Sequence, residues 1–449
     1  MMWRLVFLVI LFTRLEVNAR LQIGPYLEPT VRPSFGSNFV WAKVDNFDPD
    51  NNQTWKQYYY ERSRSDSNVN ILYIGGEGPN SLQKLDAAVS PSYPGLVEDL
   101  RQAFGAAVYT LEHRYYQSSY PVKHPRTAED FKYLSSQQAL ADIENFIKAM
   151  NKGRRNQKWI TIGGSYAGML AIWHRQLYPQ STVGTIGSSG PVHAVANFTS
   201  FFMVAQIGYK QQYPKCYEWL KKAFAEFKVL LENKDDKLKK LYPVLAERYD
   251  IEKEEDAHYF AYHVVSDAYT QIQFRIWGIC GHYSPTPNET PVQTLARLFG
   301  HTADDIESVY WRSWMWQVCN EFGFFYSPDD ANCLANGIYD IKKVYGVQCK
   351  RFFGPKFTYE YMEKQIQKTL DFYQMDKPYP ATNAIITNSV YDPWSGQGLK
   401  KATSDTVKFF WIRNGTHCHD LYSGSNPDVY ESRKVIKQEV ARWIRESRN

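Results

Sequence analysis

The stretch WITIGGSYAGM, residues 159–169, says more about this chain than any other segment. Four strand-forming residues lead into a sharp glycine turn, and a helix-compatible stretch follows from Met169 to Leu177. A strand–turn–helix of this kind strains the backbone and lifts the hydroxyl of Ser165 clear of the sheet, where a base and a substrate can reach it. Ala167 replaces the last glycine of the Gly-x-Ser-x-Gly pattern, and no Gly-x-Gly-x-x-Gly spacing supports a dinucleotide loop. The stretch indicates a nucleophilic serine, with an ordinary glycine-rich turn as the alternative.

A nucleophilic serine needs a base that a carboxylate holds in place. In hydrolases built on this turn, the acid and then the histidine follow the serine along the chain. Asp392 lies in the loop after the apolar run 384–388, and His417 lies in the loop after the apolar run 409–412. Because open α/β sheets place their chemistry at the carboxyl ends of strands, this order predicts Ser165, Asp392 and His417 as catalytic residues. Taken singly, the aspartate is a common turn former and the histidine a common loop residue.

Further windows of the sequence carry a resemblance to a known family. They are GGSYAG (163–168), DPWS (392–395), LEHRYY (111–116), YLSSQQALAD (133–142) and YIGGEGP (73–79). Together they resemble the serine peptidases that include prolyl carboxypeptidase, dipeptidyl peptidase II and thymus-specific serine protease. The resemblance runs from about Trp41 to the C-terminus, and Cys418, directly after the histidine, is most similar to the thymus-specific branch.

This resemblance implies an α/β-hydrolase core with a large helical cap insertion. It also implies a serine exopeptidase that hydrolyses small peptides through an acyl-enzyme, with His417 and not His419 as the base. The backbone amides of Tyr166 and of Gly76, in the loop after the strand 70–74, are expected to form the oxyanion hole. No metal or organic cofactor is expected, because the histidines and cysteines show no ligand spacing. The expected division is a signal peptide (1–19), the first part of the core (20–192), a helical cap (193–350) and the second part of the core (351–449).

Three residues are candidates for substrate binding. Met169 and Trp394 stand where family members that cleave after proline line their pocket, and a thioether and an indole suit a pyrrolidine ring. Both side chains serve equally well as packing. Glu77 and Glu112 are loop carboxylates, and either is a candidate to bind the free amine of a substrate. The favoured role for both is structural, as an ion pair with Arg114 or a cap on the backbone.

Two positions depart from the family pattern. Gln117 stands where the family usually has glycine, which puts the local turn in doubt. Tyr422 stands where the prolyl carboxypeptidase branch has arginine. A carboxypeptidase needs a fixed cation near the site to bind the free C-terminal carboxylate of its substrate. The sequence therefore leaves open whether the enzyme is a carboxypeptidase or a dipeptidyl-peptidase.

Composition and N-terminal pattern indicate an exported chain. Of the 449 residues, 44% are hydrophobic. Basic and acidic residues are mixed along the chain and leave a net charge of only +5, which gives nucleic-acid binding little support. Arg4, the apolar run 5–12 and a cleavage point after Ala19 predict a secretory signal peptide and no membrane anchor. A secreted or lysosomal location follows, and the candidate glycosylation sites fit it: Asn52, Asn197, Asn288 and Asn414.

Six cysteines in an exported chain can all be paired, in fifteen arrangements. The family resemblance suggests a disulfide between Cys319 and Cys349. A second disulfide between Cys216 and Cys333 is then a hypothesis, and it would leave Cys280 for Cys418.

Two other functions stay open. The same turn serves ester substrates, so a secreted esterase or lipase is one alternative, and a catalytically silent binding protein that keeps the scaffold is the other. Peptides are the expected partners, and a homodimer is among the assemblies that the sequence does not decide.

Overall fold

The computed structural model describes residues 38–62, 67–78, 95–275, 278–281, 283, 286, 288–299, 309–422 and 426–447. The predicted signal peptide, residues 1–19, lies outside these ranges. Within them, no helix has the length and apolar character needed to cross a bilayer.

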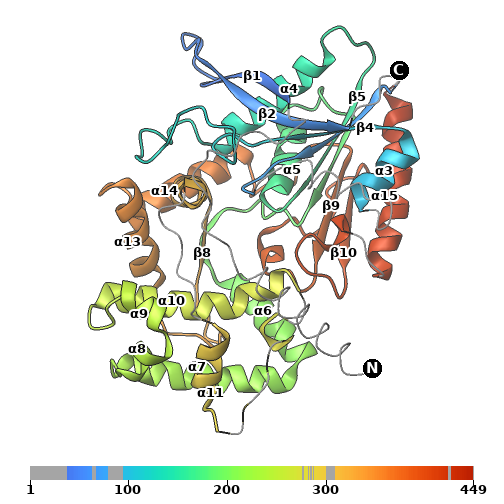
Figure 1. The fold of residues 1–449 in the computed structure, drawn as a ribbon. Helices are drawn as coiled ribbons and strands as arrows, with labels where there is room; N and C mark the ends of the chain where they lie inside the picture. The colour runs from blue at the N-terminus through green and yellow to red at the C-terminus, as the bar shows by residue number, and fades with distance from the viewer. Residues whose placement is uncertain are drawn as a thin grey trace, which may run out of the picture.

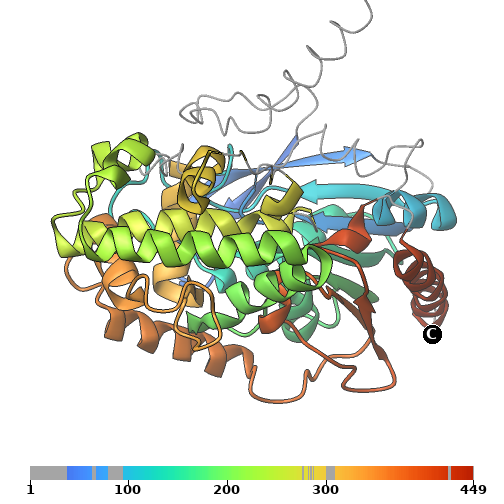
Figure 2. The same cartoon turned by 90° about the horizontal axis from the view of Figure 1, so that it is seen from below.

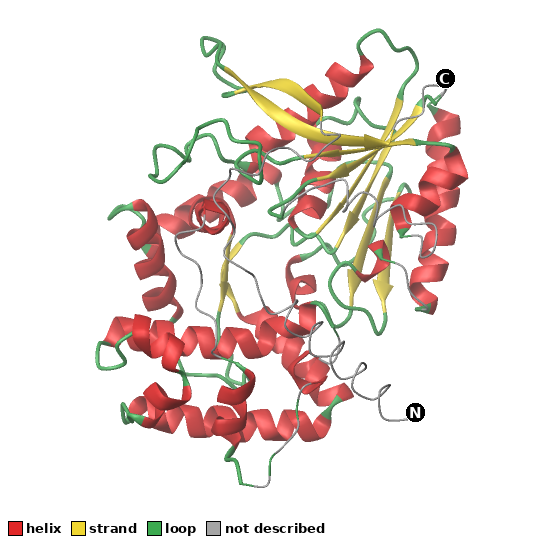
Figure 3. Ribbon diagram, in the orientation of Figure 1, coloured by secondary structure: helices red, strands yellow, loops and turns green. Residues whose placement is uncertain are grey.

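An eight-stranded sheet forms the centre of the described chain (Figures 1 and 3). Its order is β1-β2-β4-β3-β5-β6-β9-β10, with β2 antiparallel to both of its neighbours and all other pairs parallel. A mostly parallel sheet whose strands alternate with helices confirms the predicted α/β-hydrolase fold. The strands are β1 (Asn38–Lys43), β2 (Thr54–Arg62), β3 (Val69–Ile74), β4 (Ala107–Leu111), β5 (Lys158–Gly164), β6 (Gly184–Ser188), β9 (Ala384–Ser389) and β10 (Val407–Ile412).

Helices cover both faces of this sheet, so its central strands β3, β5, β6 and β9 are buried along almost their whole length. Side chains alternate between the two faces of β5: Ile160 and Ile162 pack on the side of α3 and α15, and Trp159 packs on the side of α4 and α5 (Figure 1). The four helices are α3 (Leu96–Phe104), α4 (Ser136–Asn151), α5 (Tyr166–Leu177) and α15 (Pro427–Glu446).

The chain leaves the sheet after β6 and returns to it at β9, and the residues between are mostly helical (Figures 1 and 2). This helical region also contains a two-stranded parallel sheet of β7 (Val195–Phe198) and β8 (Gly323–Tyr326), which the sequence pattern did not indicate. Its helices are α6 (Thr199–Gln212), α7 (Pro214–Glu232), α8 (Lys237–Leu241), α9 (Pro243–Arg248), α10 (Glu254–Thr270), η1 (Gln271–Gln273), η2 (Gly278–Gly281), α11 (Pro291–Leu298), α12 (Val309–Gln317), η3 (Val318–Phe322), α13 (Ile341–Phe353) and α14 (Tyr359–Tyr373).

One of the three expected disulfides is confirmed and two are wrong. Cys319 and Cys349 are joined, as the resemblance implied. Cys216 is joined to Cys280, and not to Cys333.

The remaining two cysteines, Cys333 and Cys418, are free and buried. The side chain of Cys418 packs into the core beside the sheet: its Sγ lies 2.9 Å from the position that a Cβ on Gly164 would take. Cys216, at the start of α7, instead has Cys280 of η2 within a Cα–Cα distance of 5.7 Å.

The loop after β4 makes a turn at Gln117, which stands where the family usually has glycine. Gln117 has φ 57°, in the left-handed region that favours glycine, and the Oε1 atom of its buried amide has no hydrogen-bond partner among the described residues.

Replacing Gln117 with glycine should therefore stabilise the protein. A left-handed conformation costs a non-glycine residue about 1–2 kcal/mol, so Gln117→Gly should raise the free energy of unfolding by about 0.5–1 kcal/mol. Urea unfolding measures this change. Gln102→Gly, within α3, is the control and should lower the free energy of unfolding by about 1 kcal/mol. A destabilised Gln117→Gly variant would show that the turn is not strained.

Candidate active site

Ser165 stands at the turn between β5 and α5 with φ 60° and ψ −131°, a strained conformation for any residue other than glycine. The glycines near Ser165 have no room for a side chain, because backbone atoms lie too close to them. A Cβ on Gly163 would lie 2.0 Å from the carbonyl oxygen of Ala167, and one on Gly168 would lie 2.6 Å from that of Ser188. The amide of Ser165 donates to the Ser188 carbonyl at 2.9 Å, so the turn is pinned to the end of β6.

Asp392 follows β9 and is completely buried. Its side chain caps the short helix η4 (Pro393–Gln397), with Oδ1 accepting from the amide of Trp394 at 3.0 Å. Both carboxylate oxygens lie 2.9 Å from Nδ1 of His417. The carboxylate is thus oriented by the backbone and aimed at the imidazole.

His417 follows β10, and its imidazole is 12% exposed. Its amide donates to the carbonyl of Gln273 in the helical region at 3.0 Å, which fixes the loop. Burial alone lowers the pKa of His417, but the Asp392 carboxylate and the neighbouring Cys418 outweigh burial and hold that pKa well above its ordinary value. Because a carboxylate only accepts, Nδ1 carries the proton, and Nε2 is left to act as a base.

The three residues lie at the carboxyl ends of β5, β9 and β10, which point to the same edge of the sheet (Figure 3). The segment 417–418 is held against the serine turn, because Cys418 packs on Gly164 and its amide donates to Ser189 Oγ at 3.0 Å. Among these described residues, no hydrogen bond joins the Ser165 hydroxyl to the His417 imidazole. Such bonds are often long in the absence of substrate.

The glycine loop after β3 lies beside the serine turn. The amide of Gly75 is occupied, since it donates to the carbonyl of Leu111 at 3.2 Å. Gly76 lies next to the start of α5, where an added Cβ would be 3.3 Å from the amide nitrogen of Ala167. The loop therefore brings Gly76, the expected second oxyanion donor, against the residues that follow Ser165.

Met169 is completely buried in α5, and Trp394 is 9% exposed. The indole nitrogen of Trp394 donates to Gln273 Oε1 at 2.8 Å, and its ring centroid lies 6.1 Å from that of His417. Aromatic rings of the helical region surround the indole: Phe198, Phe201, Phe324 and Tyr326. An apolar wall thus stands beside the histidine.

The two loop glutamates have different surroundings. Glu77 is partly exposed, and its charge adds to the burial that raises the pKa of Tyr166 and Tyr326, so it lies near both the serine turn and β8. Glu112 is buried and accepts from the Tyr60 and Ser119 hydroxyls, at 3.0 and 2.7 Å.

The structure corrects one expected alternative for Glu112. Arg114 pairs with Asp142 at 2.6 Å and not with Glu112. Burial raises the pKa of Glu112 to about 7, and none of the described residues forms an ion pair with it. His419 starts the short helix η5 (His419–Leu421), and Tyr422 is 61% exposed.

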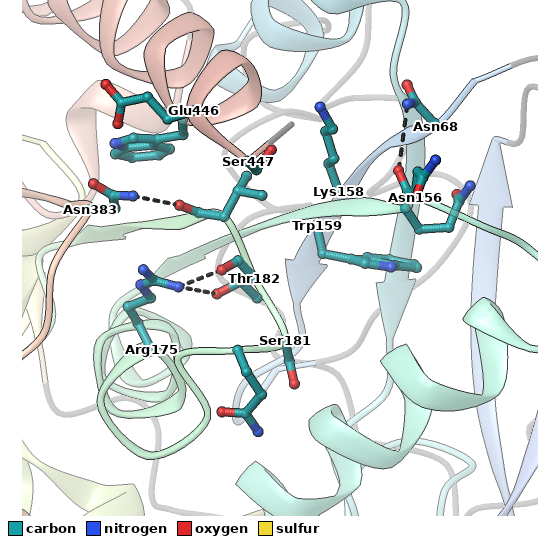
Figure 4. Close-up of a pocket in the computed structure, with 14 residues that line it drawn as sticks. Asn68, Asn156, Lys158, Trp159, Arg175, Ser181, Thr182, Asn383, Glu446 and Ser447 are labelled. Carbon is teal, nitrogen blue, oxygen red and sulfur yellow. Dashed lines mark hydrogen bonds between the residues drawn. The ribbon is translucent and has the colours of Figure 1, made fainter. Parts of the chain in front are cut away.

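A polar cavity of about 710 Å³ lies at the opposite edge of the sheet (Figure 4). It is lined by residues at the amino ends of the strands, including Asn68, Lys158 and Asn383. Its polar groups bind one another: Arg175 donates to the Thr182 carbonyl, and Lys158 Nζ donates to a carbonyl at the end of α15 at 2.7 Å. Because the candidate catalytic residues lie at the carboxyl ends, this cavity is not the active site.

A group of three or more His, Cys, Asp or Glu side chains that could hold a metal ion does not occur among the residues the structure describes.

Comparison with known proteins identifies the family. The model of the family described as serine carboxypeptidase S28 matches residues 42–279 and 286–439. The chain belongs to this family. The S28 fold and a serine-type peptidase activity are thereby established for it.

Individual relatives of this S28 peptidase are distant but match over most of their length. Bovine lysosomal Pro-X carboxypeptidase is 24% identical over 93% of this chain and 89% of its own. Human thymus-specific serine protease is 25% identical over 84% and 79%. A solved structure of proline iminopeptidase from Mycobacterium smegmatis covers 91% of this chain and all of its own at 11% identity, with a TM-score of 0.39.

Proposed function

We propose that this serine peptidase is an exopeptidase that hydrolyses small peptides through Ser165, His417 and Asp392. The observation that carries the proposal is the bond of both Asp392 oxygens to His417 Nδ1, at the edge of the sheet where the strained Ser165 turn also ends. A base held in one tautomer beside a raised hydroxyl is the arrangement that acyl transfer needs.

The reaction follows from these positions. Ser165 Oγ attacks the peptide carbonyl carbon while His417 Nε2 takes the hydroxyl proton. The negative charge on the carbonyl oxygen is met by the amides of Tyr166 and Gly76. His417 then gives the proton to the leaving amine, an acyl-enzyme forms on Ser165, and a water activated by the same imidazole releases the acid.

A preference for proline at the scissile bond is part of the proposal. Trp394 lies beside His417, rings of the helical region surround its indole, and Met169 is buried one helical turn after Ser165. A flat, apolar wall suits the rigid pyrrolidine ring. The name of the bovine relative, a Pro-X carboxypeptidase, agrees with this preference.

We further propose that residues 193–350 of the helical region form a cap over the site. This cap would limit the substrates to small peptides. Its contacts with the histidine loop support this role, since Gln273 bonds both to His417 and to Trp394. For Glu77, we propose that the carboxylate binds a substrate amine, because it is partly exposed and directly follows Gly76, which lies against the start of α5.

The proposed route is export to the lysosome or the cell exterior, after removal of residues 1–19. Two disulfides support an oxidising compartment, and the relatives include lysosomal enzymes by name. The proposed glycan sites are all exposed: Asn52, Asn197, Asn288 and Asn414.

A fluorophosphonate probe tests the nucleophile. The wild-type protein should be labelled, and Ser165→Ala should not, because the phosphonyl group bonds to the activated hydroxyl alone. Equal labelling of both proteins would contradict the assignment.

Matched substrates then test the bond and the terminus. Peptides with proline or alanine before the scissile bond, each with free or blocked ends, are compared with nitrophenyl esters. We expect cleavage of the proline peptides to require one free end. Turnover of the esters alone would contradict the proposed exopeptidase activity.

A further inference from the structure

A buried chain of hydrogen bonds leads from the serine turn into the helical region. The hydroxyl of Tyr166, the residue after Ser165, accepts from Gln317 Nε2 at 2.8 Å and lies 2.9 Å from His113 Nε2. Gln317 Oε1 accepts from the Tyr116 hydroxyl at 2.6 Å. Tyr166, Gln317 and Tyr116 are each at most 1% exposed, so water does not compete for these bonds.

Chemistry fixes the direction of each bond. His113 Nδ1 lies 2.7 Å from the carbonyl oxygen of Arg114, which only accepts, so Nδ1 carries the ring proton. Burial lowers the pKa of His113 to about 3, and the neutral ring therefore accepts at Nε2 from the Tyr166 hydroxyl. That hydroxyl accepts in turn from Gln317, whose amide is oriented by the Tyr116 hydroxyl. The Tyr166 oxygen thus has a single favourable position.

The far end of the chain is anchored in two further helices. Glu321, in the π-helical turn η3, accepts from the amide and hydroxyl of Ser136 at 2.8 and 2.7 Å, and from Gln317 Nε2 at 3.4 Å. Ser136 is the first residue of α4, where the helix dipole favours a carboxylate. The hydroxyl of Tyr373, at the end of α14, donates to Ser136 Oγ at 2.8 Å. Gln317 is therefore held by groups that cannot easily move.

A strained residue stays strained only where its surroundings over-determine it. The ψ of −131° at Ser165 sets the direction of the next amide, that of Tyr166. The Tyr166 ring packs against Trp314 and Phe322, with centroids at 6.0 and 5.3 Å, but ring packing alone allows sliding along the ring axis. The hydroxyl bonds are directional and therefore fix the ring along that axis.

We propose that Gln317 is a positioning residue for catalysis. Through the Tyr166 hydroxyl, it holds the Tyr166 amide in the direction that stabilises the oxyanion. This inference rests on the proposed roles of Ser165 as nucleophile and of the Tyr166 amide as oxyanion donor. The helical region then helps to shape the catalytic turn itself, in addition to covering it.

Three variants test this role in the full-length protein: Gln317→Leu, Tyr166→Phe and the double variant. A loosely held oxyanion donor affects the transition state more than the bound substrate. Each single variant should therefore lower kcat about tenfold to hundredfold, with KM within about twofold of wild type. The double variant should fall no further than the more impaired single one, since both break the same bond.

Controls separate this role from general damage. Asn320→Ala removes a bond between η3 and Tyr361 that does not belong to the chain, and it should keep the wild-type kcat. Tyr166→Phe removes one oxygen atom and keeps the backbone amide, so it decides the matter if Gln317→Leu fails to fold.

Two results would overturn the inference: wild-type kcat in Tyr166→Phe, or effects that multiply in the double variant. The proposed nucleophile fails separately, if Ser165→Ala is still labelled by the fluorophosphonate probe.

Discussion

Replacing Asp392 with asparagine should lower kcat about 10³- to 10⁴-fold while leaving the fold intact. The carboxylate accepts the proton of His417 Nδ1 through both of its oxygens, at 2.9 Å. An asparagine of the same shape offers an amide donor as well, which favours the tautomer with the proton on Nε2. That tautomer cannot take the proton of Ser165.

The same substitution should also change the pH dependence of kcat/KM. The Asp392 carboxylate, together with Cys418, outweighs burial and holds the pKa of His417 above its ordinary value. The imidazole must be neutral to act as a base, so wild-type activity rises as pH increases through that pKa. Without the carboxylate the pKa falls, and the acidic limb of the residual activity should move to lower pH. Steady-state kinetics across the pH range measures both effects.

Asp420 provides the matched control, because it is a second buried carboxylate in the histidine loop. Its oxygens accept from the hydroxyls of Ser188 and Thr387, and neither reaches the imidazole. Asp420→Asn should therefore keep kcat within about tenfold of wild type. Equal losses in Asp392→Asn and Asp420→Asn would mean that Asp392 does not orient the base.

Replacing Gly163 with alanine should destabilise the protein by about 3 kcal/mol or more and remove fluorophosphonate labelling. The added Cβ would lie 2.0 Å from the carbonyl oxygen of Ala167 and 2.4 Å from its carbon. Both contacts are to backbone at the start of α5, so no side chain can rotate away. The serine turn has to open, and Ser165 loses its position.

Gly346→Ala is the control for Gly163→Ala. Gly346 lies within α13, and its nearest contact for an added Cβ is 3.9 Å away, on Tyr359. Alanine should fit there and raise the free energy of unfolding by up to about 1 kcal/mol, through its helix propensity. Chemical unfolding of both variants, followed by labelling, gives the comparison. A Gly163→Ala protein of wild-type stability and labelling would refute the steric account of the turn.

Much of the fold could be predicted from local patterns in the sequence. The run 159–169 places a strand, a turn and a helix in sequence, and β5 and α5 have those positions. The apolar runs before Asp392 and His417 are β9 and β10. Period, turn chemistry and strand-forming residues are encoded within a few neighbours, and a reader of the sequence can recover them.

Pairings between distant residues were recovered only in part. Cys319 and Cys349 followed from the resemblance, but the partner of Cys216 did not, because six cysteines allow fifteen arrangements and spacing does not rank them. The free Cys418 depends on the space beside Gly164, which exists only once β5 and the histidine loop have packed.

The sequence by itself determined the order of the candidate catalytic residues, the strained glycine turn and the parallel sheet that brings strand ends to one edge. Only the tertiary structure decided which buried groups meet: Arg114 with Asp142, Glu112 with hydroxyls, and Gln317 with Tyr166. The physical reason is the range of each constraint. Backbone geometry is set by residues close in sequence, whereas a buried polar group takes whichever partner the packing of distant elements leaves within about 3 Å.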